Sequence, residues 1–174
     1  MLTVSVFGLG YVGLPTAVIF ASRGYNVIGV DINDKKVEHV NSGICYIQEP
    51  QLDILLKEVV SKGLLKATTD GVNAIKSSDA IIITVPTPVN QYKADLNYLK
   101  SVLKLVREHL RKDILIIIES TIPPGTTVKF IKPFLEESGM QVEKDFYLAH
   151  VPERIAPGKA IEELLNACLL YTSP

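Results

Sequence analysis

Short apolar runs alternate with amphipathic stretches along the 174 residues of the chain. Runs such as ILIII are apolar throughout, which is typical of strands buried on both faces of a parallel sheet. The stretches between the runs repeat their apolar residues at helical spacing. Strands are predicted at residues 2–7, 26–30, 64–68, 80–85, 114–118 and 146–150, and helices at 12–23, 34–41, 52–62, 96–110 and 126–137. Pro133 predicts a kink or break in the last of these helices.

A glycine-rich turn follows the first predicted strand. Gly8, Gly10 and Gly13 form the pattern GxGxxG directly before a predicted helix, and Asp31 ends the second strand. The pattern alone is a weak signal, but this context is what a dinucleotide site requires. Gly8 permits the tight turn, Gly10 lets the backbone approach a pyrophosphate, and Gly13 lets the helix pack close to the strand. The N–H groups at the start of the helix would then face the phosphates.

Asp31 bears on the choice of cofactor. Its carboxylate would accept hydrogen bonds from the adenosine ribose hydroxyls, and its charge would repel a 2′-phosphate, so NAD is favoured over NADP. The alternative is a glycine-rich turn followed by a solvated acid. Strands separated by helices, together with this turn, predict an α/β fold, which is a Rossmann-type doubly wound parallel sheet with helices on both faces.

Composition narrows the possible partners. Hydrophobic residues make up 47% of the chain and charged residues 21%, as in one globular domain with a full core. The net charge is -1, so no broad basic surface is available and nucleic acid is not an expected partner. No apolar run reaches the roughly 18–20 residues that span a bilayer, so no membrane partner is expected. Cys45 and Cys168 lack the spacing of a metal site or a disulfide framework, and a cytoplasmic location is predicted.

Polar residues follow several strands at the point where each strand ends. Thr87 follows the fourth predicted strand, the pair Ser120-Thr121 the fifth and the pair Glu153-Arg154 the sixth. Ligands bind outside the carboxyl ends of parallel strands, so these residues are predicted to gather at one edge. Simpler interpretations remain open: a rigid turn at Thr87, a structural strand exit at Ser120-Thr121, and a surface ion pair at Glu153-Arg154.

Together the motifs resemble the UDP-glucose/GDP-mannose dehydrogenase family, over residues 2–165. The sequence from residue 152 onwards is more similar to that of the UDP-N-acetylhexosamine branch than to that of the UDP-glucose branch. The matching segments are GLGYVGLP at 8–15, VDIN at 30–33, the pair Glu49-Pro50, VPTP at 85–88, ADL at 94–96, ESTIPPGTT at 119–127 and PERIAPGKA at 152–160.

The resemblance implies an activity and a set of site residues. Such enzymes oxidise the C6 alcohol of a nucleotide sugar to a carboxylate with two NAD, and they trap the aldehyde on a cysteine before hydrolysis. For this chain a UDP-sugar, from the UDP-N-acetylhexosamine class, is the expected substrate. Glu153 matches the glutamate that handles protons and water, Thr121 joins it in the catalytic set, and Arg154 and Ile155 would contact the substrate. The implied NAD contacts, beside the three glycines, are Tyr11, Val12, Asp31, Lys36, Thr87 and Thr121.

The resemblance also implies parts that this chain does not include. The family's nucleophilic cysteine, catalytic lysine, central dimerisation helix and UDP-binding domain lie further along, so residues 1–167 are expected to be an NAD-binding domain that is inactive alone. The full-length protein is expected to be a homo-oligomer. Residues 168–174 read CLLYTSP, which one frame of a transposase-type sequencing adapter would encode, so they are expected to be non-native. An authentic divergent C-terminus is the alternative.

Two other functions compete with this interpretation. One is a stand-alone NAD-binding module without chemistry, which the motifs do not separate from the enzyme. The other is a different dehydrogenase on the same fold, such as a hydroxyacid enzyme, since a fold alone does not fix a function. The segments ESTIPPGT and PERIAPG argue against the second.

Overall fold

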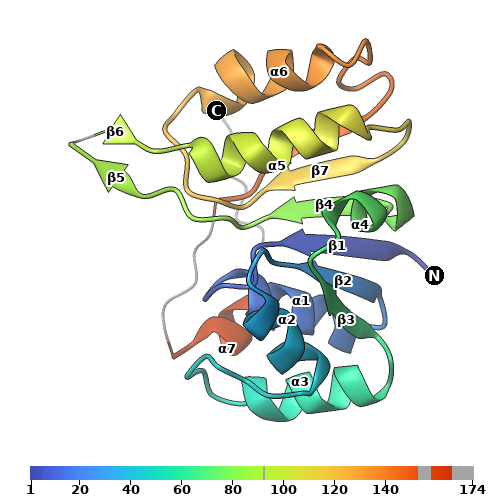
Figure 1. Ribbon diagram of the computed structural model, residues 1–174. Coiled ribbons are helices and arrows are strands. Elements are labelled where there is room, and N and C mark those ends of the chain that lie inside the picture. The colour runs from blue at the N-terminus through green and yellow to red at the C-terminus, as the bar shows by residue number, and fades with distance from the viewer. Residues whose placement is uncertain (92, 153–157, 166–174) are drawn as a thin grey trace.

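In the computed structural model, which describes residues 1–91, 93–152 and 158–165, a six-stranded parallel sheet forms the centre of the protein (Figure 1). Its strand order is β3-β2-β1-β4-β7-β8. The order reverses between β1 and β4, so the connections leave these two strands in opposite directions, and the predicted doubly wound fold is confirmed. The strands are β1 (Thr3–Phe7), β2 (Asn26–Val30), β3 (Leu65–Thr68), β4 (Ala80–Ile83), β7 (Leu115–Ile118) and β8 (Tyr147–His150).

Helices cover both faces of the sheet (Figure 1). On one face lie α1 (Gly13–Ser22), α3 (Leu52–Ser61) and α7 (Ala160–Leu165), with α2 (Asp34–Asn41) beside β3. On the other face lie α4 (Gly71–Ser77), α5 (Asn97–Glu108) and α6 (Lys132–Glu136). No helix in the described ranges is long and apolar enough to cross a membrane.

Successive residues of the central strands enter the two halves of the core. Ile82 of β4 packs in the cluster under α1 and α3, whereas Ile81 and Ile83 pack in the cluster under α5. All three side chains are almost fully buried. A strand with two buried faces needs no polar alternation, which is why the central runs of the sequence are apolar almost throughout.

The kink or break predicted at Pro133 takes the form of a change in helix type. The backbone stays helical through Ile131 and Lys132. A five-residue π-helix, η1 (Thr127–Ile131), is followed directly by α6, in which Pro133 occupies the first turn. Proline has no N–H to donate to the preceding turn, so a switch from π-helical to α-helical hydrogen bonding directly before it fits this position. Four elements were not predicted: α4, α7 and the strands β5 (Val89–Asn90) and β6 (Lys93–Ala94), which form a small antiparallel hairpin.

Candidate functional site

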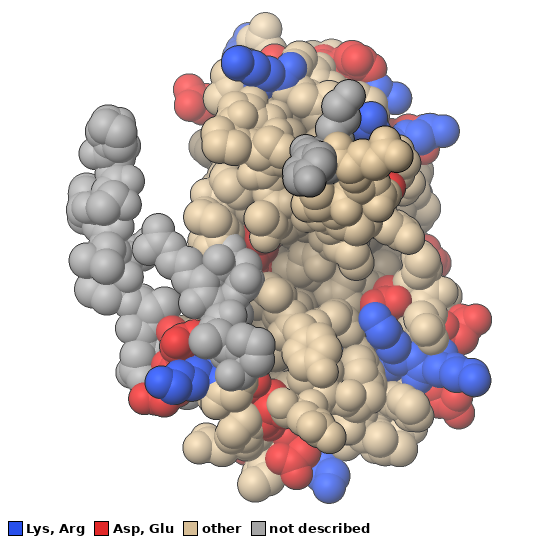
Figure 2. Space-filling view, turned by 90° about the vertical axis from the view of Figure 1, so that its left-hand side faces the viewer, with Lys and Arg blue, Asp and Glu red and all other residues tan. Residues whose placement is uncertain are grey.

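The carboxyl ends of the strands form one edge of the sheet, on the left in Figure 1, and Figure 2 looks onto this edge. The face is hollowed in its middle, where the visible side chains are mostly uncharged. Charged side chains gather around the rim instead. An anionic ligand seated in the hollow would therefore depend on backbone N–H groups and on a few placed side chains.

The turn between β1 and α1 is held in a conformation that only glycine adopts easily. Gly8 has a φ of 97°, and a Cβ on this residue would lie 3.0 Å from the backbone oxygen of Thr84. The Gly8 N–H donates to the carbonyl of Val30 at 2.7 Å. The turn is therefore locked to both neighbouring strands, β2 and β4.

Gly13 and Gly10 differ in what surrounds them. A Cβ on Gly13 would lie 1.8 Å from the Gly8 carbonyl oxygen and 2.4 Å from Oγ1 of Thr84, so the close packing predicted for Gly13 is present. Among the described residues, a Cβ on Gly10 would meet no atom within 4 Å, and the φ of Gly10 lies outside the left-handed region. No neighbour in the described part of the chain requires a glycine at position 10. Its bare backbone faces open space, as a ligand that approaches the turn closely would need.

No acidic side chain in the first turn of α1 offsets the partial positive charge at the N-terminus of this helix. The Leu14 N–H already donates to the Gly10 carbonyl at 3.0 Å. The N–H groups of Gly8 and Leu9 already donate to Val30 and Asp31, so a ligand at this end of α1 would meet the N–H groups from Gly10 to Gly13. This end of α1 is suited to a phosphate group.

Asp31 lies just after β2 and is almost buried, with 8% of its surface exposed. Its Oδ2 accepts from the Leu9 N–H at 2.9 Å, and its Oδ1 accepts from the Asn33 N–H at 3.0 Å. Lys36 Nζ lies 3.2 Å from Oδ2. The carboxylate therefore also holds the glycine turn in place. The sequence did not predict this structural role for Asp31.

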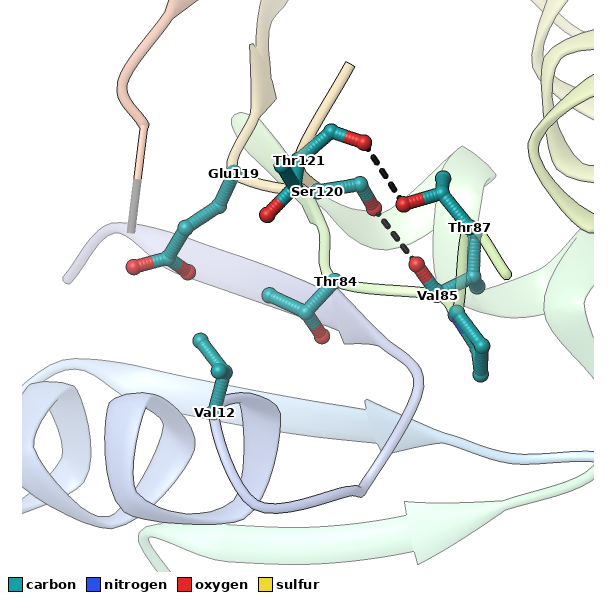
Figure 3. A pocket seen from close by; sticks show the side chains of 8 residues that line it. Val12, Thr84, Val85, Thr87, Glu119, Ser120 and Thr121 are labelled. Atoms are coloured by element: carbon teal, nitrogen blue, oxygen red, sulfur yellow. Dashed lines mark hydrogen bonds between the residues drawn. The ribbon is translucent and has the colours of Figure 1, made fainter. Parts of the chain in front are cut away.

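A cleft of about 190 Å³, open to solvent, separates the start of α1 from the ends of β4 and β7 (Figure 3). The hydroxyl of Thr87 donates to the Thr121 carbonyl at 2.6 Å, and the hydroxyl of Ser120 donates to the Val85 carbonyl at 2.8 Å. These bonds join the two strand exits into one wall. The lining residues are Val12, Thr84, Val85, Pro86, Thr87, Glu119, Ser120 and Thr121.

Two polar lining residues, Thr84 and Glu119, were given no role by the sequence. The hydroxyl of Thr84 donates to the Gly8 carbonyl at 2.7 Å, which ties β4 to the glycine turn. Glu119 and Val12 reach toward the same space from two sides of the cleft (Figure 3), and the hydroxyl of Thr16 donates to Glu119 at 3.4 Å. A polar residue at the end of an otherwise apolar strand run is the only signal that marks Thr84 in the sequence.

Residues 2–168 match the NAD binding domain of the UDP-glucose/GDP-mannose dehydrogenase family. The chain belongs to this family. UDP-N-acetyl-D-mannosamine dehydrogenases from Pyrococcus horikoshii and Campylobacter jejuni are 47% and 46% identical to it over 162 and 172 residues. These alignments include 93% and 94% of this chain but only 38% and 41% of the relatives, so the chain spans about two fifths of their length.

Solved structures of the family share the fold. The UDP-D-ManNAc dehydrogenase of Pyrococcus horikoshii superposes with a TM-score of 0.89 at 47% identity, over 94% of this chain and 39% of that one. The GDP-mannose dehydrogenase of Pseudomonas aeruginosa, solved as a ternary complex, gives 0.88 at 34% identity, over 92% and 38%. A 3-hydroxyisobutyrate dehydrogenase from Mycobacterium tuberculosis gives 0.62 at 18% identity, a likeness of fold alone. Family membership therefore excludes the hydroxyacid enzyme as an interpretation.

The structure brings most of the predicted site residues to one edge. The glycine turn, Asp31 and Lys36 lie together at the end of β2, and Val12, Thr87 and Thr121 line the cleft. Tyr11 lies on the turn with 67% of its surface exposed. Three predicted residues, Glu153, Arg154 and Ile155, lie outside the described residues, as does the segment 168–174. In the described part of the chain, no three His, Cys, Asp or Glu side chains could together hold a metal ion.

Replacing Thr87 by Val removes the hydroxyl that joins the two strand exits. The variant should lower the free energy of unfolding by about 1 kcal/mol, the usual effect of one lost hydrogen bond. Thr87→Ser keeps the hydroxyl and should remain within about 0.5 kcal/mol of the wild type. Urea unfolding measures both variants. Equal stability of the Val variant and the wild type would mean that the 2.6 Å contact to Thr121 contributes nothing.

Proposed function

We propose that this chain holds NAD across the carboxyl edge of its sheet, with the pyrophosphate on the turn from Gly8 to Gly13. The observation that carries the proposal is the contrast within that turn. Gly13 is required by its protein neighbours, whereas Gly10 is open on the side that faces solvent. A bare backbone at the start of a helix that has no acid in its first turn suits a diphosphate.

The adenosine end of the cofactor belongs beside Asp31. Its two oxygens are held in place by the N–H groups of Leu9 and Asn33, and a fixed carboxylate can accept from both ribose hydroxyls. Lys36 would lie on the same side, where its ion pair with Asp31 leaves the ammonium partly exposed. The mostly buried carboxylate would oppose a 2′-phosphate, which favours NAD over NADP.

The nicotinamide end belongs in the cleft between α1 and the ends of β4 and β7. Tyr11 and Val12 would contact the cofactor from the turn, and Thr87 and Thr121 from the opposite wall. NAD, when bound, accepts a hydride from the carbon that is oxidised. The described residues of this wall orient the ring and separate it from water. Thr121, at the exit of β7, is the described residue that we place next to the reacting carbon.

For the longer protein we propose the oxidation of a UDP-sugar, with a UDP-N-acetylhexosamine as substrate. The support is the 47% and 46% identity to two proteins named UDP-N-acetyl-D-mannosamine dehydrogenase. In this scheme residues 1–167 are the NAD-binding domain, Glu153 handles protons and water, and Arg154 and Ile155 contact the sugar. The nucleophilic cysteine and the lysine would come from the part of the relatives that this chain does not cover.

The experiment is a stoichiometry measurement on a protein that continues past residue 167 into the region the relatives possess. Oxidation of a primary alcohol to a carboxylate needs two hydride acceptors, so each UDP-N-acetylmannosamine should yield two NADH. UDP-N-acetylglucosamine and UDP-glucose serve as competitors for specificity. One NADH per sugar would contradict the two-step oxidation to a carboxylate. No NADH with any UDP-sugar, while NAD still binds, would contradict the enzyme and leave a binding module.

A further inference from the structure

The loop between α2 and α3, residues 42–51, touches two parts of the chain that are far apart in sequence. Tyr46 contacts the glycine turn, and Glu49 contacts the start of α7. Between these two side chains, Ile47 is 6% exposed and packs in the same core cluster as Leu9 and Ile161. The loop thus lies at the meeting point of the turn, α3 and α7.

Tyr46 makes the second of two side-chain hydrogen bonds to the backbone of Leu9. The Tyr46 hydroxyl donates to the Leu9 carbonyl at 2.7 Å, while the Leu9 N–H donates to Asp31 at 2.9 Å. Both polar groups of this residue of the GxGxxG turn are therefore held by side chains from elsewhere. Burial, and then the nearby charge of Asp31, raise the pKa of Tyr46 above its ordinary value, which further favours the protonated hydroxyl that donates this bond.

Glu49 holds the chain just after the segment that carries the proposed substrate residues. Its Oε2 accepts from the Gly158 N–H at 2.8 Å, and its Oε1 accepts from the Ala160 N–H at 2.7 Å. Only 9% of Glu49 is exposed. A buried carboxylate with both oxygens occupied by N–H donors is a strong local anchor, because hydrogen bonds to a charged acceptor exceed neutral ones.

The loop itself is tied together between the two contacts. The Ile47 carbonyl accepts from the Glu49 N–H at 3.2 Å and from the Cys45 thiol at 3.2 Å. The Leu52 N–H, at the start of α3, donates to the Glu49 carbonyl at 3.2 Å. These bonds and the buried Ile47 hold the loop in one conformation. A displacement of one contact would therefore displace the other.

We propose that Tyr46 and Glu49 are positioning residues on one brace, residues 45–49, which fixes the glycine turn relative to Gly158 and Ala160. This role rests on the proposed NAD site. If the cofactor lies on the glycine turn, the brace would fix the position of the cofactor relative to Gly158 and Ala160, which follow residues 153–155 in the chain. Neither side chain is assigned to touch NAD or substrate. Each acts through the backbone of another segment.

Hydrogen exchange on the cofactor-free chain tests the brace without relying on NAD. Tyr46→Phe removes one hydroxyl, so amides in residues 8–14 should exchange about fivefold faster. Glu49→Gln replaces one acceptor oxygen by a donor, so amides in residues 158–165 should exchange about tenfold faster. Tyr25→Phe and Glu58→Gln are matched controls, because Tyr25 packs on Phe20 and Glu58 is exposed, and neither should change these two regions.

NAD affinity is the second measurement. Tyr46→Phe should weaken NAD binding about fivefold while Tyr25→Phe leaves it unchanged. Exchange that is unchanged in residues 8–14 and 158–165, or that rises equally across β1 and β4, would overturn the brace. If Glu49→Gln does not fold, Ala160→Pro removes one of the two donors at a helix start and should give the same local effect. A folded wild-type chain that fails to bind NAD would refute the proposed function, whereas the exchange data would still decide the brace.

Discussion

Gly13→Ala should lower the free energy of unfolding by about 3 kcal/mol, at the upper end of what overpacking a close-packed site usually produces. The new Cβ would lie 1.8 Å from the Gly8 carbonyl oxygen and 2.4 Å from Oγ1 of Thr84. These two atoms are hydrogen-bonded to each other at 2.7 Å, so neither can move without breaking the link between β4 and the turn. The clash outweighs the gain of up to about 1 kcal/mol that alanine normally gives over glycine in a helix. Urea unfolding is the measurement.

Gly10→Ala is the matched control for this prediction. Its Cβ meets no atom of residues 1–91, 93–152 or 158–165 within 4 Å, so stability should stay within about 0.5 kcal/mol of the wild type. NAD binding should nevertheless weaken sharply, since the methyl group would occupy the side from which the pyrophosphate approaches. The pair separates folding from binding. Full NAD affinity in Gly10→Ala would place the cofactor elsewhere, and a stable Gly13→Ala would contradict the close packing of the turn.

Asp31→Ala should weaken NAD binding by about 10- to 100-fold, because hydrogen bonds from hydroxyls to a carboxylate contribute about 1.5–3 kcal/mol each. NADP should be affected much less, so the preference for NAD should shrink. The variant should also lose about 2 kcal/mol of stability, since the Leu9 N–H is left without its buried acceptor. Isothermal calorimetry with both cofactors and urea unfolding give the two quantities.

Asp34→Ala is the control for Asp31→Ala. Asp34 is an exposed acid in the first turn of α2, three residues further along the chain. Removing it changes the net charge equally, yet NAD affinity and the NAD preference should not change. If the two variants bind NAD alike, the carboxylate of Asp31 serves only to order the turn.

The sequence predicted the elements well where local signals were strong. The bounds of β2 and α2 were predicted correctly, because NVIGV is a β-branched run and Asn33 caps α2 by accepting from the N–H groups of Lys35 and Lys36. The helix α4 was missed, since it is short and begins at Gly71. Its stability comes from the Asp70 cap and from packing of Leu105 against Gly71, and the second of these is invisible in the local pattern.

The candidate site followed from topology more than from any single motif. Parallel strands bring their carboxyl ends to one edge, so Thr87 and Thr121 could be expected near each other from the strand order alone. The hydrogen bond between them, the link from Thr84 to Gly8, and the contacts of Tyr46 and Glu49 could not be predicted. Each joins residues at least 34 positions apart, and no periodicity or composition encodes such pairs.

The most direct test of the NAD site is a calorimetric titration of the wild-type chain with NAD and then with NADP. The turn and Asp31 predict one NAD per chain, with NADP at least about tenfold weaker because its 2′-phosphate meets the Asp31 carboxylate. A folded chain that releases no heat with NAD, or that binds NADP as tightly, would contradict the assigned site.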